Sequence, residues 1–216
     1  MKLYFISGLG ADERVFQFLH LPGMDKTFIQ WIEPKKNESI PAYAARLSEQ
    51  IDFQQEVVLI GISFGGIIAQ EIAKQFPCKK TIIISSIKSH KEFSLSLLLV
   101  RFTQIHKLFS ASVLKWSNTF TADYYFSTES TGESNLLHRI IQDTNDTFLI
   151  WAIQQLMQWK GDGLDRQVIH IHGTTDRIFP IGSIKGAIRI DQGGHFMIVN
   201  KSTQVSAILL EELSRP

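Results

Sequence analysis

One stretch, residues 57–70, constrains the fold of this chain more than any other. Four aliphatic residues at 57–60 lead through Gly-Ile-Ser-Phe-Gly at 61–65 into a segment whose apolar residues recur with helical spacing. A buried strand that passes directly into a helix requires a very sharp turn, and the glycines on either side of the serine let neighbouring backbones approach closely. The turn places Ser63 at a helix N-terminus, where amide N–H groups favour negative charge. Ser63 is therefore a candidate nucleophile.

Strands and helices alternate around this stretch. Before residue 87 the pattern predicts strands at 3–6, 28–32, 57–62 and 81–84, and helices at 12–20, 39–51 and 64–76. After residue 160 it predicts strands at 167–172 and 187–190 and a last helix at 198–213. Alternation at this spacing is typical of a parallel sheet with helices on both faces.

The alternation is interrupted in the middle of the chain. From residue 87 to about 160 no strand pattern appears; helices are predicted near 93–109, 112–120 and 145–159, and a polar patch lies at 127–134. No repeat, low-complexity tract or sharp change of composition marks an independent domain. We therefore predict one domain, residues 1–216, with a helical cap inserted at about 87–165.

Composition narrows the functional classes. The hydrophobic fraction of 44% and the charged fraction of 20% are ordinary for a globular protein, and the net charge of +1 gives no argument for nucleic acid or an anionic membrane as a partner. Cys78 is the single cysteine, which excludes an intrachain disulfide and favours a reducing compartment. The first strand reaches Ser-Gly too soon for a signal peptide, and the apolar run at 95–100 is too short to span a bilayer. We expect a cytoplasmic protein without a membrane span.

Two further polar segments follow predicted strands. Asp176 lies in the loop after the fifth predicted strand, and His195 lies in the loop after the sixth. Carboxyl ends of parallel strands meet at one edge of a sheet, which is the edge that presents Ser63. A serine hydroxyl becomes a good nucleophile when a base takes its proton; histidine titrates in the right range, and a carboxylate fixes the imidazole tautomer. The three residues have the types and positions that nucleophilic catalysis requires.

These segments resemble the α/β-hydrolase superfamily, and the resemblance covers nearly the whole chain. Gly-Ile-Ser-Phe-Gly-Gly at 61–66 is similar to its nucleophile elbow, and Gly-Gly-His-Phe at 193–196 is similar to its histidine segment. The run His-Gly-Thr-Thr-Asp-Arg-Ile-Phe-Pro, which ends at Pro180, is similar to the segment that carries its acid. The resemblance implies Ser63 as nucleophile, His195 as general base and then acid, and Asp176 as the orienting acid.

The resemblance also implies an oxyanion hole formed by the backbone N–H groups of Phe64 and Leu9. Members of the superfamily often have His-Gly after the first strand, whereas this chain has Ser7-Gly8. Because the donor is a backbone N–H, the change alters only what surrounds the hole. The chain also begins at that strand, without the two N-terminal strands of larger members. The expected fold is an α/β-hydrolase fold with a minimal six-stranded parallel sheet, helices on both faces and a helical cap insertion.

Two alternatives compete with these assignments. Asp176 could merely cap a turn, and Asp191 lies four residues before His195 as a second candidate acid. His170 and His172 share one side of a strand and could be metal ligands, but no third ligand stands at a recognisable spacing. We interpret both histidines as structural and predict neither a metal nor a cofactor.

The many aromatic residues of the predicted cap bear on the substrate. Most of them are expected to seal the cap against the sheet, yet pockets beneath such caps are mostly apolar. An acyl chain or an aromatic group is therefore favoured over a sugar or a highly charged ligand. We predict a serine hydrolase that cleaves a small-molecule ester or thioester through an acyl-enzyme. The alternatives on the same scaffold are a non-hydrolytic ligand-binding protein and a lyase or C–C bond hydrolase.

Overall fold

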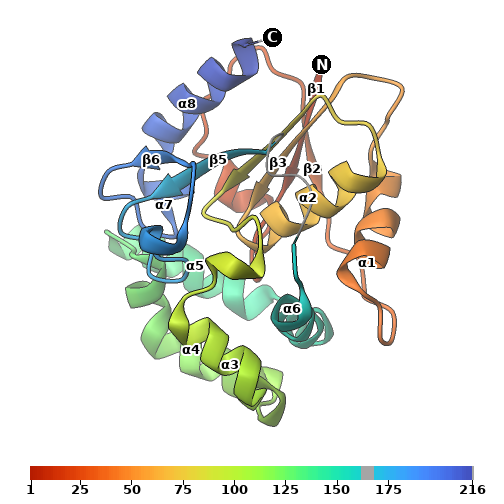
Figure 1. Cartoon of the computed structure of the whole chain (residues 1–216). Coiled ribbons are helices and arrows are strands. Elements are labelled where there is room, and N and C mark those ends of the chain that lie inside the picture. Colours follow the sequence, from red (N-terminus) through yellow and green to blue (C-terminus); the bar gives the residue numbers. More distant parts are fainter. Residues whose placement is uncertain (162–167, 216) are drawn as a thin grey trace.

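A six-stranded parallel sheet forms the centre of the molecule (Figure 1). The computed structural model describes residues 1–161 and 168–215. Its strands, in the spatial order β2-β1-β3-β4-β5-β6, are β1 (Lys2–Ile6), β2 (Lys26–Ile29), β3 (Val57–Ile62), β4 (Lys80–Ile84), β5 (Val168–Gly173) and β6 (Ile188–Ile190). All neighbouring pairs are parallel, so the predicted six-stranded parallel sheet is confirmed.

Two layers of helices cover the sheet, one on each face. Helices α1 (Ile40–Leu47) and α2 (Phe64–Gln75) pack on one face, and α7 (Met197–Asn200) and α8 (Ser202–Ser214) pack on the other. Strand β3 is buried along its whole length and supplies both cores, because side chains alternate across a strand. Val58 and Ile60 enter one core, while Leu59 enters the other.

Between β4 and β5 the described chain is helical. It contains α3 (Leu95–Thr103), α4 (Ala111–Phe126), α5 (Thr131–Asp143) and α6 (Asp146–Gln158), which we call the inserted helices. Figure 1 shows them at the end of the molecule opposite to both chain termini. Within the described residues 87–161 no strand interrupts them, as predicted, whereas residues 162–165 of the predicted insertion lie outside the described residues.

The structure corrects the N-terminal boundaries. In place of a helix at 12–20 there is a single 3₁₀ turn, Glu13–Phe16, although Asp12 caps it as expected by accepting a hydrogen bond from the Arg14 N–H. The second strand ends at Ile29 rather than at residue 32. Beyond that point the Ile32 N–H donates to the Tyr43 hydroxyl instead of to a neighbouring strand. Side chains of other elements thus end the ladder earlier than the apolar pattern indicates.

The structure also corrects three helices. The polar patch at 127–134 contains the start of α5, because Ser130 accepts a hydrogen bond from the Glu133 N–H and Glu133 accepts one from the Glu129 N–H. The helix expected at 39–51 is capped by Ser39 but ends at Leu47 and continues only as a 3₁₀ turn. The last helix is divided at Lys201 into α7 and α8. Residue 167 of the predicted fifth strand lies outside the described residues.

Candidate active site

Ser63 occupies the turn between β3 and α2 in a strained backbone conformation. Its φ of 51° and ψ of −119° lie outside the regions that non-glycine residues normally adopt. Such a conformation costs roughly 1–3 kcal/mol and persists only where the surroundings fix it. Here the Ser63 N–H donates to the Ile84 carbonyl at 2.9 Å, and the Ser86 hydroxyl donates to the Ser63 carbonyl at 2.7 Å. Strand β4 therefore holds the turn in place.

The two glycines that flank Ser63 are required by close backbone contacts. A methyl group on Gly65 would lie 2.1 Å from the Ser7 carbonyl oxygen, and one on Gly61 would lie 2.3 Å from the Gly65 carbonyl oxygen. No side chain fits at these distances, because the obstructing atoms belong to the backbone. The glycine spacing in the sequence thus reflects the packing of α2 against β1 and β3.

The structure brings Ser63, His195 and Asp176 together in one hydrogen-bonded line. His195 Nε2 lies 3.0 Å from Ser63 Oγ, and His195 Nδ1 lies 2.8 Å from Asp176 Oδ2. These distances fall within the range for a nucleophile bonded to a base and for a base bonded to an orienting carboxylate. Ser63 is part-exposed, whereas His195 and Asp176 are buried. The imidazole is therefore shielded from water while the hydroxyl remains accessible.

Asp176 is held by three partners. Its Oδ1 accepts hydrogen bonds from the Ile178 and Phe179 N–H groups, each at 2.9 Å, so that Oδ2 is directed at His195. Burial acts to raise the pKa of this carboxyl, but the charge and hydrogen bond of His195 together with the Phe179 N–H outweigh it, and the pKa lies below its ordinary value. The alternative acid, Asp191, is exposed and accepts a hydrogen bond from the Thr174 hydroxyl.

Two phenylalanines that the sequence analysis did not single out pack against the imidazole of His195. The rings of Phe126 and Phe179 approach it edge-on, with centroid distances of 5.2 and 5.6 Å. Phe126 ends α4, and its carbonyl accepts a hydrogen bond from the Phe196 N–H at 2.9 Å. No periodic pattern in the sequence marks this contact, because it joins the end of an inserted helix to a loop 69 residues further along.

His170 and His172, both on β5, form a buried pair next to Asp176. His170 Nε2 lies 3.1 Å from His172 Nδ1, and His172 Nε2 lies 2.7 Å from the Phe179 carbonyl oxygen. Burial lowers the pKa of both rings, that of His170 to about 3 with a smaller contribution from the charge of His172. In the part of the chain that the structure describes, no group of three or more His, Cys, Asp or Glu side chains could hold a metal ion.

Leu9 and Phe64, the two residues proposed from the sequence for the oxyanion hole, line the same cavity as Ser63. Leu9 belongs to the loop after β1, and Phe64 is the first residue of α2. The Gly8 backbone lies directly against the serine, since a methyl group on Gly8 would be 3.3 Å from Ser63 Cβ. The Ser7 hydroxyl donates to the Ala11 carbonyl at 2.7 Å and closes the loop.

A largely apolar cavity of about 190 Å³ opens at Ser63. Leu9, Ile67, Phe126, Ile141, Leu149, Ile153, Leu156, Ile178 and Phe179 supply its apolar walls. Among the described residues that line it, Thr144 is the one polar side chain besides Ser63 and His195. A second recess of about 30 Å³ shares six lining residues with this cavity, among them Ser63 and His195. Ser63 therefore lines two apolar spaces of different size.

Comparison with known proteins agrees with this architecture. No protein-family model matches the chain, and no curated protein matches it. Many solved structures are similar, and they include a carboxylesterase of the ammonia-oxidizing thaumarchaeon Nitrososphaera gargenis (TM-score 0.75, 15% identity, 99% of this chain and 89% of that chain), a malate-bound thermophilic esterase from Thermogutta terrifontis (0.70, 15%, 99% and 89%) and MenH from S. aureus (0.71, 14%, 98% and 92%). At these identities the likeness establishes the fold. The chain has the α/β-hydrolase fold.

Proposed function

We propose that the protein is a serine hydrolase that cleaves an ester or thioester bond of a small, largely apolar substrate. The observation that carries the proposal is the line from Asp176 through His195 to Ser63, with distances of 2.8 and 3.0 Å, at the mouth of an apolar cavity. Solved structures of similar fold include proteins described as esterases and a carboxylesterase, which supports the same reaction class.

In the proposed first step, Ser63 Oγ attacks the substrate carbonyl while His195 Nε2 accepts the hydroxyl proton. The ionised Asp176 stabilises the imidazolium that forms and keeps Nδ1 protonated. The N–H groups of Phe64 and Leu9 are proposed to donate to the oxyanion. One such donor typically contributes roughly 3–4 kcal/mol to transition-state stabilisation. His195 then protonates the leaving alkoxide or thiolate, and an acyl-enzyme on Ser63 remains.

In the proposed second step, water replaces the leaving group. His195 removes a proton from this water, which attacks the acyl carbonyl, and the same proton returns to Ser63 as the acid product leaves. The resulting charge again falls on the oxygen bound by the two amides. The cycle requires no metal or cofactor, because the protons exchanged all pass through one imidazole.

The cavity supports a preference for short acyl or aryl groups. Its volume of about 190 Å³ lies below the roughly 300–1,000 Å³ of typical ligand sites. With Thr144 as the one polar side chain beyond Ser63 and His195, a sugar or a phosphate would lose its water without gaining partners. In this proposal residues 1–216 are one domain, and the insertion at about 87–165 is a cap that supplies the walls through α5 and α6.

Labelling with a serine-directed fluorophosphonate tests the proposed nucleophile. We expect one adduct per chain, on Ser63, and no adduct on the Ser63→Ala variant. The matched control is Ser112→Ala, which removes an exposed hydroxyl from α4 and should leave labelling unchanged. Absence of labelling in the wild-type protein would instead indicate a non-hydrolytic ligand-binding protein.

A panel of p-nitrophenyl esters of increasing acyl length, together with acyl-CoA thioesters, tests the substrate class. We expect kcat/KM to be highest for short acyl groups and to fall for chains longer than the cavity can hold. A labelled Ser63 combined with no turnover of any ester or thioester would contradict the hydrolase assignment and favour a lyase or C–C bond hydrolase. An optimum on highly polar esters would contradict the substrate preference.

A further inference from the structure

Exposed apolar side chains are concentrated in one part of the molecule. Among the described residues, fourteen large hydrophobic side chains are exposed, and twelve of them lie between residues 95 and 125. They are Leu95, Leu98, Leu99, Phe102, Ile105, Leu108, Phe109, Val113, Trp116, Phe120, Tyr124 and Tyr125. We call this set the apolar face. Large exposed apolar patches on soluble proteins commonly mark surfaces that meet a protein, a membrane or a ligand.

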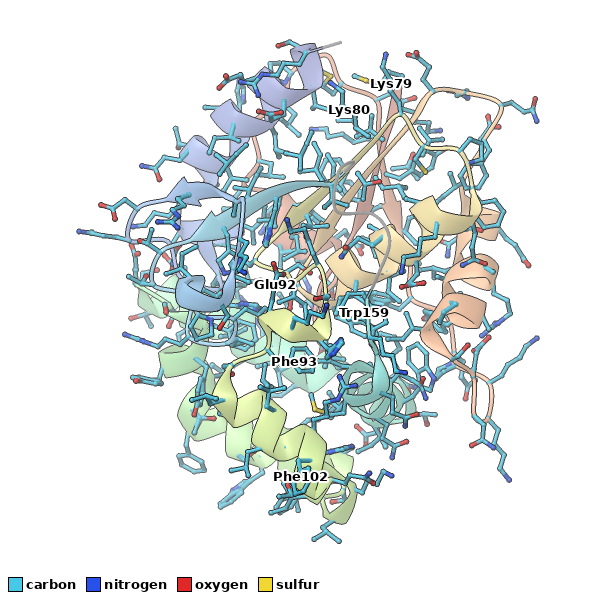
Figure 2. All side chains as sticks on the ribbon, in the orientation of Figure 1. Lys79, Lys80, Glu92, Phe93, Phe102 and Trp159 are labelled. Atoms are coloured by element: carbon cyan, nitrogen blue, oxygen red, sulfur yellow. The ribbon has the colours of Figure 1, made fainter. Side chains whose placement is uncertain are left out.

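Helix α3 turns its apolar stripe toward solvent. Leu95, Leu98, Leu99 and Phe102 follow the spacing i, i+3, i+4, i+7, which places them on one side of the helix. None of the residues of α3 is buried, and Phe102 is 89% exposed. Figure 2 shows Phe102 at the end of the molecule opposite to Lys79 and Lys80. In most amphipathic helices the apolar side packs on the core, whereas in α3 it faces solvent.

Helix α4 repeats the arrangement. Val113, Trp116, Phe120 and Tyr124 recur at intervals of three and four residues along one side of it, and the rings of Trp116 and Phe120 meet edge-on at 5.3 Å. Trp116 is 65% exposed and Phe120 is 72% exposed. Tryptophan and tyrosine have an apolar body and a polar edge, so they are favoured where hydrocarbon meets water.

Basic residues outnumber acidic residues along the apolar face. Residues 93–122 include Arg101, Lys107 and Lys115 and no aspartate or glutamate, whereas the whole chain has a net charge of only +1. Lys107 lies on the 3₁₀ turn between α3 and α4, where it donates to the Gln104 side chain at 2.6 Å. Lys115 is bonded to Asp146. Because Asp146 balances Lys115, the local positive charge comes from Arg101 and Lys107, and Asp123 is the one acidic residue within 95–125.

We propose that the apolar face docks on the surface of an anionic lipid bilayer. Short amphipathic helices with Leu, Phe and Trp on the inserted side and Lys or Arg near the headgroups bind membranes in the plane of the interface. Helices α3 and α4 have this composition, and the absence of acidic residues over 93–122 favours anionic lipid over a neutral surface. No helix in the described part of the chain is long and apolar enough to cross a bilayer.

One helix connects this face to the candidate active site. Helix α4 presents Trp116 and Phe120 outward and ends at Phe126, which lines the cavity and packs against His195. A docked molecule would hold this end of the inserted helices against the bilayer. Apolar substrates dissolved in the lipid would then lie next to the elements that line the cavity. The docking itself is independent of the proposed hydrolysis.

Co-sedimentation with vesicles tests the docking. The full chain is mixed either with vesicles of phosphatidylcholine alone or with vesicles in which about 30% of the lipid is anionic phosphatidylglycerol. We expect at least roughly tenfold stronger partitioning to the anionic vesicles, with the preference falling as salt is raised. Equal partitioning to both vesicles, or none to either, would overturn the proposal.

Variants of exposed residues separate the face from the rest of the surface. The double variant Phe102→Ser, Trp116→Ser should lower partitioning roughly tenfold or more, because it removes two exposed ring systems. The matched control is Phe18→Ser, at another exposed phenylalanine. Lys107→Glu should lower binding to anionic vesicles roughly tenfold, whereas Lys79→Glu, at the opposite end in Figure 2, should not.

The competing occupant is a second copy of the chain, and sedimentation equilibrium without lipid distinguishes it. We expect a monomer whose mass the double variant does not change. A dimer that the double variant converts to a monomer would overturn the proposal, since the face would already be covered. Fluorophosphonate labelling of the variants in detergent-free buffer should match the wild type, so a loss of docking is distinguishable from a loss of the hydrolase site.

Discussion

Strand β3 and helix α3 are both built mainly from aliphatic residues, yet they have opposite surroundings. Every residue of β3 is buried, whereas none of the residues of α3 is. β3 has neighbours on both edges and helices on both faces, while α3 contacts mainly α6 and the turn that follows it. Apolar composition therefore predicts a need for burial but does not supply the partner. The elements that bury β3 belong to the same chain, whereas for α3 we propose that the partner is a lipid bilayer.

The largest expected effect is a loss of kcat from a substitution in the turn after β3, compared with a substitution in the inserted helices. Ser63→Ala should reduce kcat for the best p-nitrophenyl ester by roughly 10⁴–10⁶-fold, because the nucleophile acts as a unit with His195. Ser112→Ala, on α4, should leave kcat unchanged. Circular dichroism spectra of both variants should match the wild type. A Ser63→Ala enzyme that retains a tenth of its activity would contradict the proposed mechanism.

Replacement of a glycine by alanine should also change the free energy of unfolding very differently in the two regions. Gly65→Ala places a methyl group 2.1 Å from the Ser7 carbonyl oxygen and should lower the free energy of unfolding by more than about 4 kcal/mol or prevent folding. In α5, a methyl group on Gly132 comes no closer than 3.9 Å to the Ser130 hydroxyl, and Gly132→Ala should raise stability by up to about 1 kcal/mol. Urea unfolding measures both; similar values would show that the elbow can relax.

Truncation of apolar side chains tests the comparison directly. Ile82→Ala, at a fully buried position of β4, should cost about 2–5 kcal/mol of unfolding free energy because it leaves a cavity. Phe102→Ala should change stability by less than about 0.5 kcal/mol, since the ring is 89% exposed. If Phe102→Ala cost more than 1 kcal/mol without lipid, the ring would have an intramolecular or intermolecular partner already in solution.

The buried imidazole of His170 should make the stability of the fold depend on pH. The folded protein keeps His170 neutral down to about pH 3, whereas the unfolded chain binds its proton below about pH 6.5. The unfolded state thus holds more protons in this window, so stability is complete above pH 6.5 and falls as the pH falls towards 3. The loss due to His170 should reach about 3 kcal/mol at pH 4. His170→Gln should reduce the slope of unfolding free energy against pH by about one proton, as followed by urea unfolding at pH 4–7.

The sequence sufficed to predict the sheet and the three polar residues of the site. Strand periodicity, the glycines around Ser63 and the positions of Asp176 and His195 after predicted strands are local features, and the rule that carboxyl ends of parallel strands meet at one edge brings them together. The spacing of Ser130 and Glu133 is typical of a capping box and could have predicted the start of α5, but the surrounding residues are polar and lack a helical apolar pattern. The contact of Phe126 with His195 was not readable, because it depends on how α4 ends against a distant loop.

By itself, the sequence determined which segments must be buried in a sheet and which residue types stand at its edge, because hydrophobic periodicity and turn chemistry act over a few residues. Only the tertiary structure decided the strained backbone of Ser63, the contact of His195 with Asp176 rather than with Asp191, and the outward direction of the apolar stripes of α3 and α4. Each of these depends on which elements meet in space. Local sequence specifies that an apolar side or a carboxylate needs a partner, and packing specifies which partner it obtains.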